Sequence, residues 1–122
     1  MLAELVGMFY CIQNKNFRYY IISPTFNQAD KMLTEIWKMC KGQPFYYKKN
    51  DIKRQLLFRN GAEIRLFSAE QGVEALQGYT CELLVIDECA YMSEDIIDAV
   101  MPYVNVSKGP IVMFSTPRTK SG

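Results

Sequence analysis

The chain has 122 residues, 49% of them hydrophobic and 22% charged, with a net charge of +1. That length suits one domain with a real apolar core, and the composition excludes disordered, collagen-like and coiled-coil proteins. A charge so near zero gives no general attraction to nucleic acid or membranes, so any basic surface must be local. The one basic run, Lys48, Lys49, Lys53 and Arg54, we interpret as a solvated face.

The cysteines and the missing histidines narrow the chemistry further. There are four cysteines with no C-x-x-C spacing, and no histidine is present. This excludes the common zinc sites and the Ser-His and Cys-His hydrolases, and it favours reduced thiols in a cytoplasmic setting. The apolar segment 1–13 carries Glu4 and is too short to span a bilayer, so we expect no membrane association.

Helix and strand signals alternate in the first third of the chain. Apolar residues at helical spacing predict a helix over 1–13, and an aromatic, β-branched run predicts a buried strand over 17–23, closed by Pro24. Asn27 is the expected N-cap of a second helix, which Gly42 ends. The pattern indicates a helix, a strand and a helix in succession.

A hairpin signal dominates the middle of the chain. After a polar connection, apolar runs flank Asn60-Gly61, a pair favoured where both central turn positions need positive φ, so residues 54–68 are predicted to form a β-hairpin. Four further elements follow, in order: a short turn or helix near 70–77, a strand at 82–87, a helix at about 93–101 and a strand at 110–115.

Three continuously hydrophobic strands are separated by helical segments, and they lie at 18–23, 82–87 and 111–115. This is typical of an α/β fold with a parallel sheet covered by helices on both faces. Right-handed crossovers bring the carboxyl ends of such strands to one edge, where open α/β sheets bind ligands. The sequence therefore places three strand ends at a ligand-binding edge: Ser23-Pro24-Thr25, Asp87-Glu88 and Ser115-Thr116-Pro117.

The segment LLVIDECAYM, residues 83–92, ends its apolar run in two adjacent carboxylates. One of them, at the strand tip, can hold Mg²⁺. Its neighbour points elsewhere because side chains alternate along a strand, and it can polarise the water that attacks a nucleotide γ-phosphate. The same pattern fits two residues that begin a loop and cap the next helix, so the residues alone leave both interpretations open.

This segment resembles the Walker B element of P-loop ATPases. Its extension IDECAYM resembles the large terminase subunit of tailed bacteriophages and prophages, the motor that pumps DNA into capsids. Other segments resemble that family in the same order: IISPTFNQADKM, GAEIRLFSAEQGVEALQGYTCELLVIDE and FSTPRTKSG. The resemblance runs from about residue 17 to the end, and the ordered set is more specific than any single segment.

The resemblance implies an α/β, RecA-like P-loop NTPase fold with a β-hairpin insertion. It implies that Asp87 holds Mg²⁺, that Glu88 is the catalytic carboxylate, and that Ser115 and Thr116 form a coupling motif that senses the γ-phosphate. A complete protein of this family would hydrolyse ATP and move double-stranded DNA in the cytoplasm of a bacterial host cell. Its partners would be the portal protein and the small terminase subunit.

The sequence departs from the family pattern in two respects. Gln77 stands where relatives often have arginine, so no arginine finger is assigned, and no G-x-x-x-x-G-K-[ST] loop is present. We therefore expect residues 1–122 to be an internal part of the ATPase domain, without the P-loop strand or the nuclease domain. ATP and Mg²⁺ would then not be bound tightly, and the strand at 110–115 would be an exposed edge that favours self-association.

Two alternatives remain on the sequence. A helicase-like nucleic-acid translocase shares the Asp-Glu strand end and a similar coupling motif. A non-catalytic binding or assembly module could keep the fold and have lost ATP.

Overall fold

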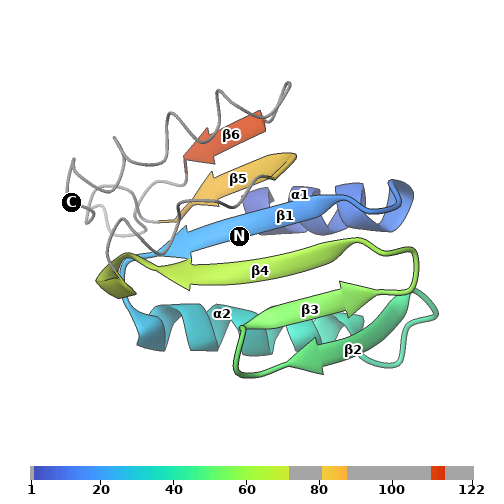
Figure 1. The fold of residues 1–122 in the computed structure, drawn as a ribbon, viewed down its shortest axis with the longest axis horizontal. Helices are drawn as coiled ribbons and strands as arrows, with labels where there is room; N and C mark the ends of the chain where they lie inside the picture. The colour runs from blue at the N-terminus through green and yellow to red at the C-terminus, as the bar shows by residue number, and fades with distance from the viewer. Residues whose placement is uncertain (1, 72–80, 88–110, 115–122) are drawn as a thin grey trace.

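The structure is a computed structural model that describes residues 2–71, 81–87 and 111–114. Its elements are α1 (Leu2–Gln13), β1 (Arg18–Ser23), α2 (Phe26–Cys40), β2 (Tyr46–Asn50), β3 (Gln55–Phe58), β4 (Glu63–Ser68), the short 3-10 helix η1 (Ala69–Gln71), β5 (Leu83–Ile86) and β6 (Ile111–Phe114). The six strands form one sheet in the order β2-β3-β4-β1-β5-β6 (Figure 1). The expected α/β architecture is confirmed.

Strand β1 lies inside this sheet and pairs in parallel with β4 on one side and β5 on the other. Strand β6 pairs in parallel with β5, so the three predicted hydrophobic strands are parallel neighbours. From Tyr19 to Ser23 every residue of β1 is buried. The continuous apolar run in the sequence thus reports a strand covered on both faces.

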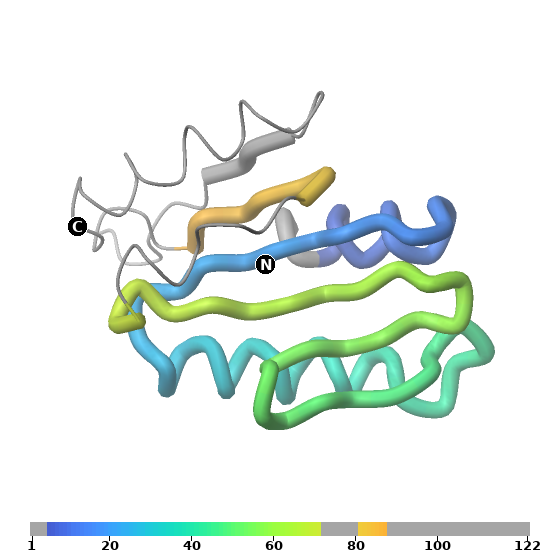
Figure 2. Tube along the Cα trace, viewed as in Figure 1, coloured from blue at the N-terminus to red at the C-terminus, as the bar shows by residue number. Residues whose placement is uncertain are grey.

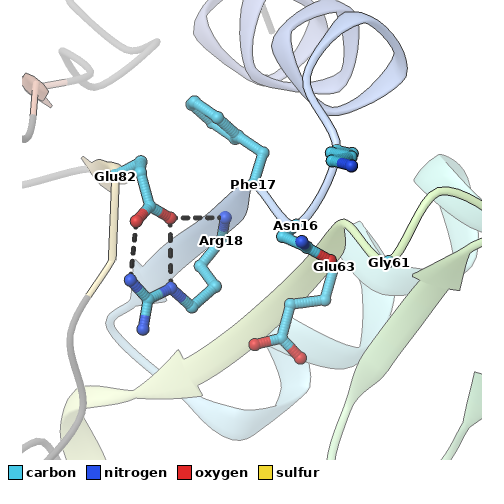
Figure 3. A pocket seen from close by; sticks show the side chains of 7 residues that line it. Asn16, Phe17, Arg18, Gly61, Glu63 and Glu82 are labelled. Carbon is cyan, nitrogen blue, oxygen red and sulfur yellow. Dashed lines mark hydrogen bonds and ion pairs between the residues drawn. The ribbon is translucent and has the colours of Figure 1, made fainter.

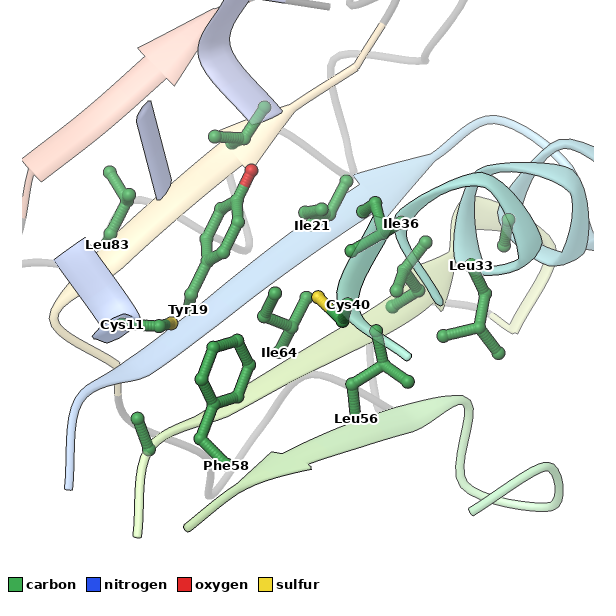
Figure 4. Packing of buried hydrophobic residues seen from close by; sticks show 14 residues of the cluster. Cys11, Tyr19, Ile21, Leu33, Ile36, Cys40, Leu56, Phe58, Ile64 and Leu83 are labelled. Atoms are coloured by element: carbon green, nitrogen blue, oxygen red, sulfur yellow. The ribbon is translucent and has the colours of Figure 1, made fainter. Parts of the chain in front are cut away.

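Helices α1 and α2 pack on the same face of the sheet. Alternate residues of β1, Tyr19 and Ile21, belong to one core cluster with Cys11 of α1 and Leu33 of α2 (Figure 4). Helices were expected on both faces, but the two described ones share a face. The helix predicted at 93–101 lies outside the described residues.

Helix α1 lies very close to β1 because it has a glycine at the contact. A Cβ atom built on Gly7 would stand 2.2 Å from atoms of the Tyr19 ring. The ring is fully buried, so it has no free space into which to move. Gly7 therefore sets the distance between helix and sheet.

The N-cap of α2 is Thr25, which corrects the expectation that Asn27 caps this helix. Thr25 keeps an extended backbone, with a φ of −132°, and its hydroxyl accepts a hydrogen bond from the backbone N–H of Gln28 at 3.2 Å. Asn27 lies in the first turn. At the other end the helix stops as predicted, because Gly42 takes a φ of +83°.

The hairpin between β3 and β4 is confirmed, but its turn differs from the expected one. Gly61 has a φ of +88° while Asn60 keeps a negative φ, and the Gly61 N–H donates to the Phe58 carbonyl at 3.1 Å. This is a three-residue loop with a single left-handed position. Asn60 serves a tertiary contact, since its side-chain amide donates to the Cys11 carbonyl in the last turn of α1 at 2.9 Å.

The middle of the chain contains one more strand than expected. The polar connection before the hairpin contains strand β2, which pairs antiparallel with β3 and forms an edge of the sheet. The hairpin extends the sheet, because β4 joins β1 in parallel. Trp37 of α2 holds β2 by donating to the Tyr46 hydroxyl at 3.1 Å. Lys48 and Lys49 on this edge strand oppose pairing with another chain.

Gly7→Ala should destabilise the protein. Helix propensity alone would favour alanine by about 1 kcal/mol, but overpacking a buried contact costs about 1–3 kcal/mol. Because the Tyr19 ring cannot move away, we expect a net loss of about 2 kcal/mol in the free energy of unfolding, measured by urea denaturation. Gln13→Ala, at an exposed position of the same helix, should stay within about 0.5 kcal/mol of wild type. A Gly7→Ala variant as stable as wild type would contradict this packing.

Candidate functional site

Buried polar side chains gather at the carboxyl ends of the parallel strands. In the described part of the chain the buried polar or charged residues are Ser23, Ser68 and Asp87. Ser23 ends β1 and pairs with Ser68 at the end of β4, and Asp87 follows β5 directly. The Asp87 N–H donates to the Ile22 carbonyl at 2.8 Å, which extends the ladder between β1 and β5 by one bond. The three residues therefore stand at neighbouring backbone positions at the carboxyl ends of β4, β1 and β5, and these strands run side by side (Figure 2).

The pleat directs the three side chains to one face of the sheet. Side chains two positions apart on a strand share a face. The residues two positions before them all belong to the core cluster under α1 and α2: Ile21, Leu66 and Val85. On each of the three strands, the polar side chain thus follows an apolar core side chain on the same face, the one that the two helices cover.

The loops at this edge are fixed by hydrogen bonds. The Ser68 hydroxyl accepts from the Glu70 N–H at 3.0 Å, while the Ser68 N–H donates to the Gln71 side chain at 2.9 Å. The Glu70 carboxylate in turn accepts from the Phe26 N–H at 2.9 Å, which places a negative charge at the positive end of α2. The exits of β1 and β4 are therefore tied together.

Asp87 is the described residue best suited to a metal. Its side chain is buried at the sheet edge, and carboxylate oxygens are the ligands that Mg²⁺ prefers. Within the described ranges no group of three or more potential metal ligands occurs. A Mg²⁺ ion at Asp87 would thus keep water or substrate oxygens in its shell, which fits the polar edge around it.

The other predicted site residues lie outside the described residues. These are Glu88, Ser115 and Thr116. In the sequence, Glu88 follows β5, and Ser115 and Thr116 follow β6. These two strands are parallel neighbours that pair up to Ile86 and Phe114. Their roles stay predictions.

The buried cysteines do not contribute a nucleophile. Burial raises the pKa of the Cys40 thiol to about 11 and that of Cys81 to about 12, and it raises the pKa of Cys11 further. All three are free thiols that remain protonated at neutral pH. Thiol chemistry is therefore absent from the described part of the chain, since the thiolate is the reactive form.

A depression of about 670 Å³ lies at the opposite, amino edge of the sheet (Figure 3). There the Arg18 guanidinium grips the Glu82 carboxylate through two hydrogen bonds of 2.6 and 3.1 Å, and the Arg18 N–H donates to the same carboxylate at 2.7 Å. These bonds join the start of β1 to the residue before β5. Because α/β sheets bind ligands at carboxyl ends, we assign this edge a structural role.

The sequence of this chain matches the family described as terminase large subunit, T4likevirus-type, N-terminal, over residues 2–121. The chain belongs to the large terminase family. No curated protein matches it. In the described part of this terminase chain, no helix has the length and apolar character needed to cross a bilayer.

Solved phage terminases share the fold. The Thermus phage P74-26 large terminase ATPase domain aligns with a TM-score of 0.72 and 20% identity, over 98% of this chain and 57% of that one. The HK97 bacteriophage large terminase aligns with a TM-score of 0.77 and 17% identity, over 94% of this chain and 26% of that one. The large terminase from a thermophilic bacteriophage aligns with a TM-score of 0.73 and 18% identity, over 95% of this chain and 30% of that one. This terminase chain thus spans only part of the length of these proteins.

Sequence reasoning finds Asp87 and misses the role of the serines beside it. The strand pattern puts Ser23 at the edge without a function, and it does not put Ser68 there at all. The missing information is the parallel pairing of β4 with β1, which brings Ser68 into register with Ser23. A serine that ends an otherwise apolar strand is the signal that could have pointed to both.

Glu82→Gln should lower stability at neutral pH and lose its effect in acid. Burial would raise the pKa of Glu82, but the hydrogen bonds from Arg18 outweigh it and hold the pKa below its ordinary 4.5. The carboxylate therefore contributes stability above that pH, and the contribution is lost as pH falls through the lowered value. Both side chains are about two-fifths exposed, so screening limits the expected loss to about 0.5–1 kcal/mol.

The measurement is the difference in unfolding free energy between wild type and Glu82→Gln from pH 7 downward. The exposed Glu35 of α2 offers a matched control, and Glu35→Gln should show a smaller difference at every pH. A Glu82→Gln difference that grows in acid would contradict the assigned ion pair.

Proposed function

We propose that this terminase chain supplies the Walker B side of the nucleotide site in a DNA-packaging ATPase. Asp87 holds Mg²⁺ and Glu88 activates the attacking water. The observation that carries the proposal is the buried position of Asp87 at the carboxyl end of β5, beside the end of β1. Carboxylate oxygens are the ligands that Mg²⁺ prefers, so a carboxylate that directly follows an apolar strand at this edge is suited to hold the cation.

The two carboxylates would have separate roles, with Asp87 at the cation and Glu88 at the attacking water. Bound Mg²⁺ would neutralise charge on the phosphate oxygens. Glu88 would orient the water and accept its proton, a role that contributes about 10²–10⁴-fold in rate.

Ser115 and Thr116 follow β6 in the sequence, and β6 is the parallel neighbour of β5. The end of β6 is therefore the natural place for hydroxyls that sense the γ-phosphate and relay its loss. We propose that these two residues couple hydrolysis to movement. This role rests on the family's coupling motif and on the strand order together.

In the whole protein, the proposed activity is ATP-driven movement of double-stranded DNA into a capsid, in the cytoplasm of a bacterial host. The large terminase of the thermophilic bacteriophage has been solved with ADP and with ATP-γ-S, which supports a nucleotide site on this fold. The DNA would be gripped by its backbone without sequence preference. The portal protein and the small terminase subunit are the proposed partners.

Asp87→Asn and Glu88→Gln should separate the two roles. In thermal unfolding with ATP and Mg²⁺, we expect Asp87→Asn to lose the Mg²⁺-dependent rise in Tm, because the cation loses its ligand. Glu88→Gln should keep that rise, because the water-activating group is not needed for binding. Equal loss in both variants would contradict the division of roles, and no rise in wild type would favour the non-catalytic alternative.

The 122-residue chain alone should show no measurable ATP turnover. Its sequence contains no glycine-rich phosphate loop, and Mg²⁺ held by one or two carboxylates needs substrate phosphates to complete its shell. A coupled assay for released phosphate tests this. Robust hydrolysis that disappears in Glu88→Gln would show that other groups of the chain hold the nucleotide.

A further inference from the structure

One hydroxyl at the carboxyl edge has no hydrogen-bond partner among the residues that the structure describes. Ser23 is fully buried, and its side-chain Oγ atom makes no hydrogen bond with any described residue. The other hydroxyls nearby are used: that of Thr25 caps α2, and that of Ser68 accepts from the Glu70 N–H. An unpaired buried hydroxyl is unfavourable, since it loses water and gains nothing in return.

A purely structural explanation does not account for this hydroxyl. If the end of β1 needed only a small side chain, alanine would fill the same space without burying a polar group. Nearly all buried polar groups in proteins are hydrogen-bonded, so the exception needs a cause. The position of Ser23 next to Asp87 supplies such a cause, because a hydroxyl there can donate a hydrogen bond to a bound ligand or accept one from it.

The strand register sets the distance between Ser23 and Asp87. Ile22 pairs with Ile86, and the Asp87 N–H bonds to the Ile22 carbonyl, so the next residues on the two strands are lateral neighbours. Neighbouring strands run about 4.8 Å apart. If Asp87 holds a cation, a water or phosphate oxygen in the shell of that cation would stand within hydrogen-bond reach of the Ser23 hydroxyl.

We propose that Ser23 is a ligand-binding residue of this site. Its hydroxyl hydrogen-bonds an oxygen in the shell of the divalent cation that Asp87 holds, which is either a water or a phosphate oxygen of the nucleotide. The inference rests on the proposed role of Asp87. It adds a group from β1, a strand that carries none of the site residues assigned above.

Stability gives the first test. Ser23→Ala removes an unpaired hydroxyl and should raise the Tm of the ligand-free chain by roughly 2–6 °C. Ser68→Ala, the matched serine in register on β4, removes a used hydroxyl and should lower the Tm. A fall in Tm for Ser23→Ala would show that its hydroxyl has an internal partner, which would overturn the inference.

Cation binding gives the second test, with Mn²⁺ as the probe. Electron paramagnetic resonance counts bound Mn²⁺ during titration of the 122-residue chain, with and without ATP. We expect weak, millimolar binding that Asp87→Asn abolishes and that Ser23→Ala weakens roughly 2- to 10-fold, the loss of one hydrogen bond. Thr34→Ala, on the exposed face of α2, should bind as wild type does.

The two arms identify the oxygen. Weaker binding of Mn²⁺ alone by Ser23→Ala points to a bound water, and weakening only in the presence of ATP points to a phosphate oxygen. Unchanged binding in both arms overturns the inference and leaves the role of Asp87 intact. A wild-type chain that binds no Mn²⁺ in either arm overturns both the role of Asp87 and the role of Ser23.

Discussion

Strand β1 has to pair along both of its edges while both of its faces are buried, and the rest of the structure follows from this constraint. Its amino end is fastened to the start of β5 by the fork between Arg18 and Glu82. Its carboxyl end is fastened to the end of β5 by the bond from Asp87 to Ile22. With both ends fixed, β5 cannot slip in register, and a slip of one residue would turn every side chain to the wrong face. The position of the candidate metal ligand is thus a consequence of how β1 is held.

The apolar runs made the parallel strands predictable, because a strand buried on both faces cannot accommodate polar residues along its length. The same logic failed for β2, whose edge position leaves Tyr47 and Lys48 exposed and gives it the composition of a loop. It also misjudged Asn60 and Asn27. Asn60 was expected for its backbone conformation and instead bonds to the end of α1, a contact that depends on tertiary structure. Thr25 takes the N-cap position of α2 in place of Asn27, because its side chain is equally suitable and it lies closer to β1.

The candidate site was predictable to the extent that its residues lie on predictable strands. Asp87 ends an obvious apolar run, so its place at the edge required only the parallel arrangement of three strands. Ser68 required the knowledge that the second strand of a hairpin also joins β1, and local turn signals do not carry such information. Glu88, Ser115 and Thr116 were assigned through family resemblance, because two carboxylates or a Ser-Thr pair after a strand have several ordinary structural uses.

The amino and carboxyl edges of the sheet differ in whether their polar side chains are paired with each other. This difference distinguishes a structural edge from a functional one. At the amino edge, Arg18 and Glu82 satisfy each other and need nothing further. At the carboxyl edge, Asp87 is buried next to Ser23, whose hydroxyl has no hydrogen-bond partner within the described residues. Alanine at position 23 would make the fold more stable than serine does. The Ser23 hydroxyl therefore serves a purpose other than stability, which we take to be ligand binding. A divalent cation with water or phosphate oxygens in its shell would give the Ser23 hydroxyl a hydrogen-bond partner, and the Asp87 carboxylate is the group able to attract that cation.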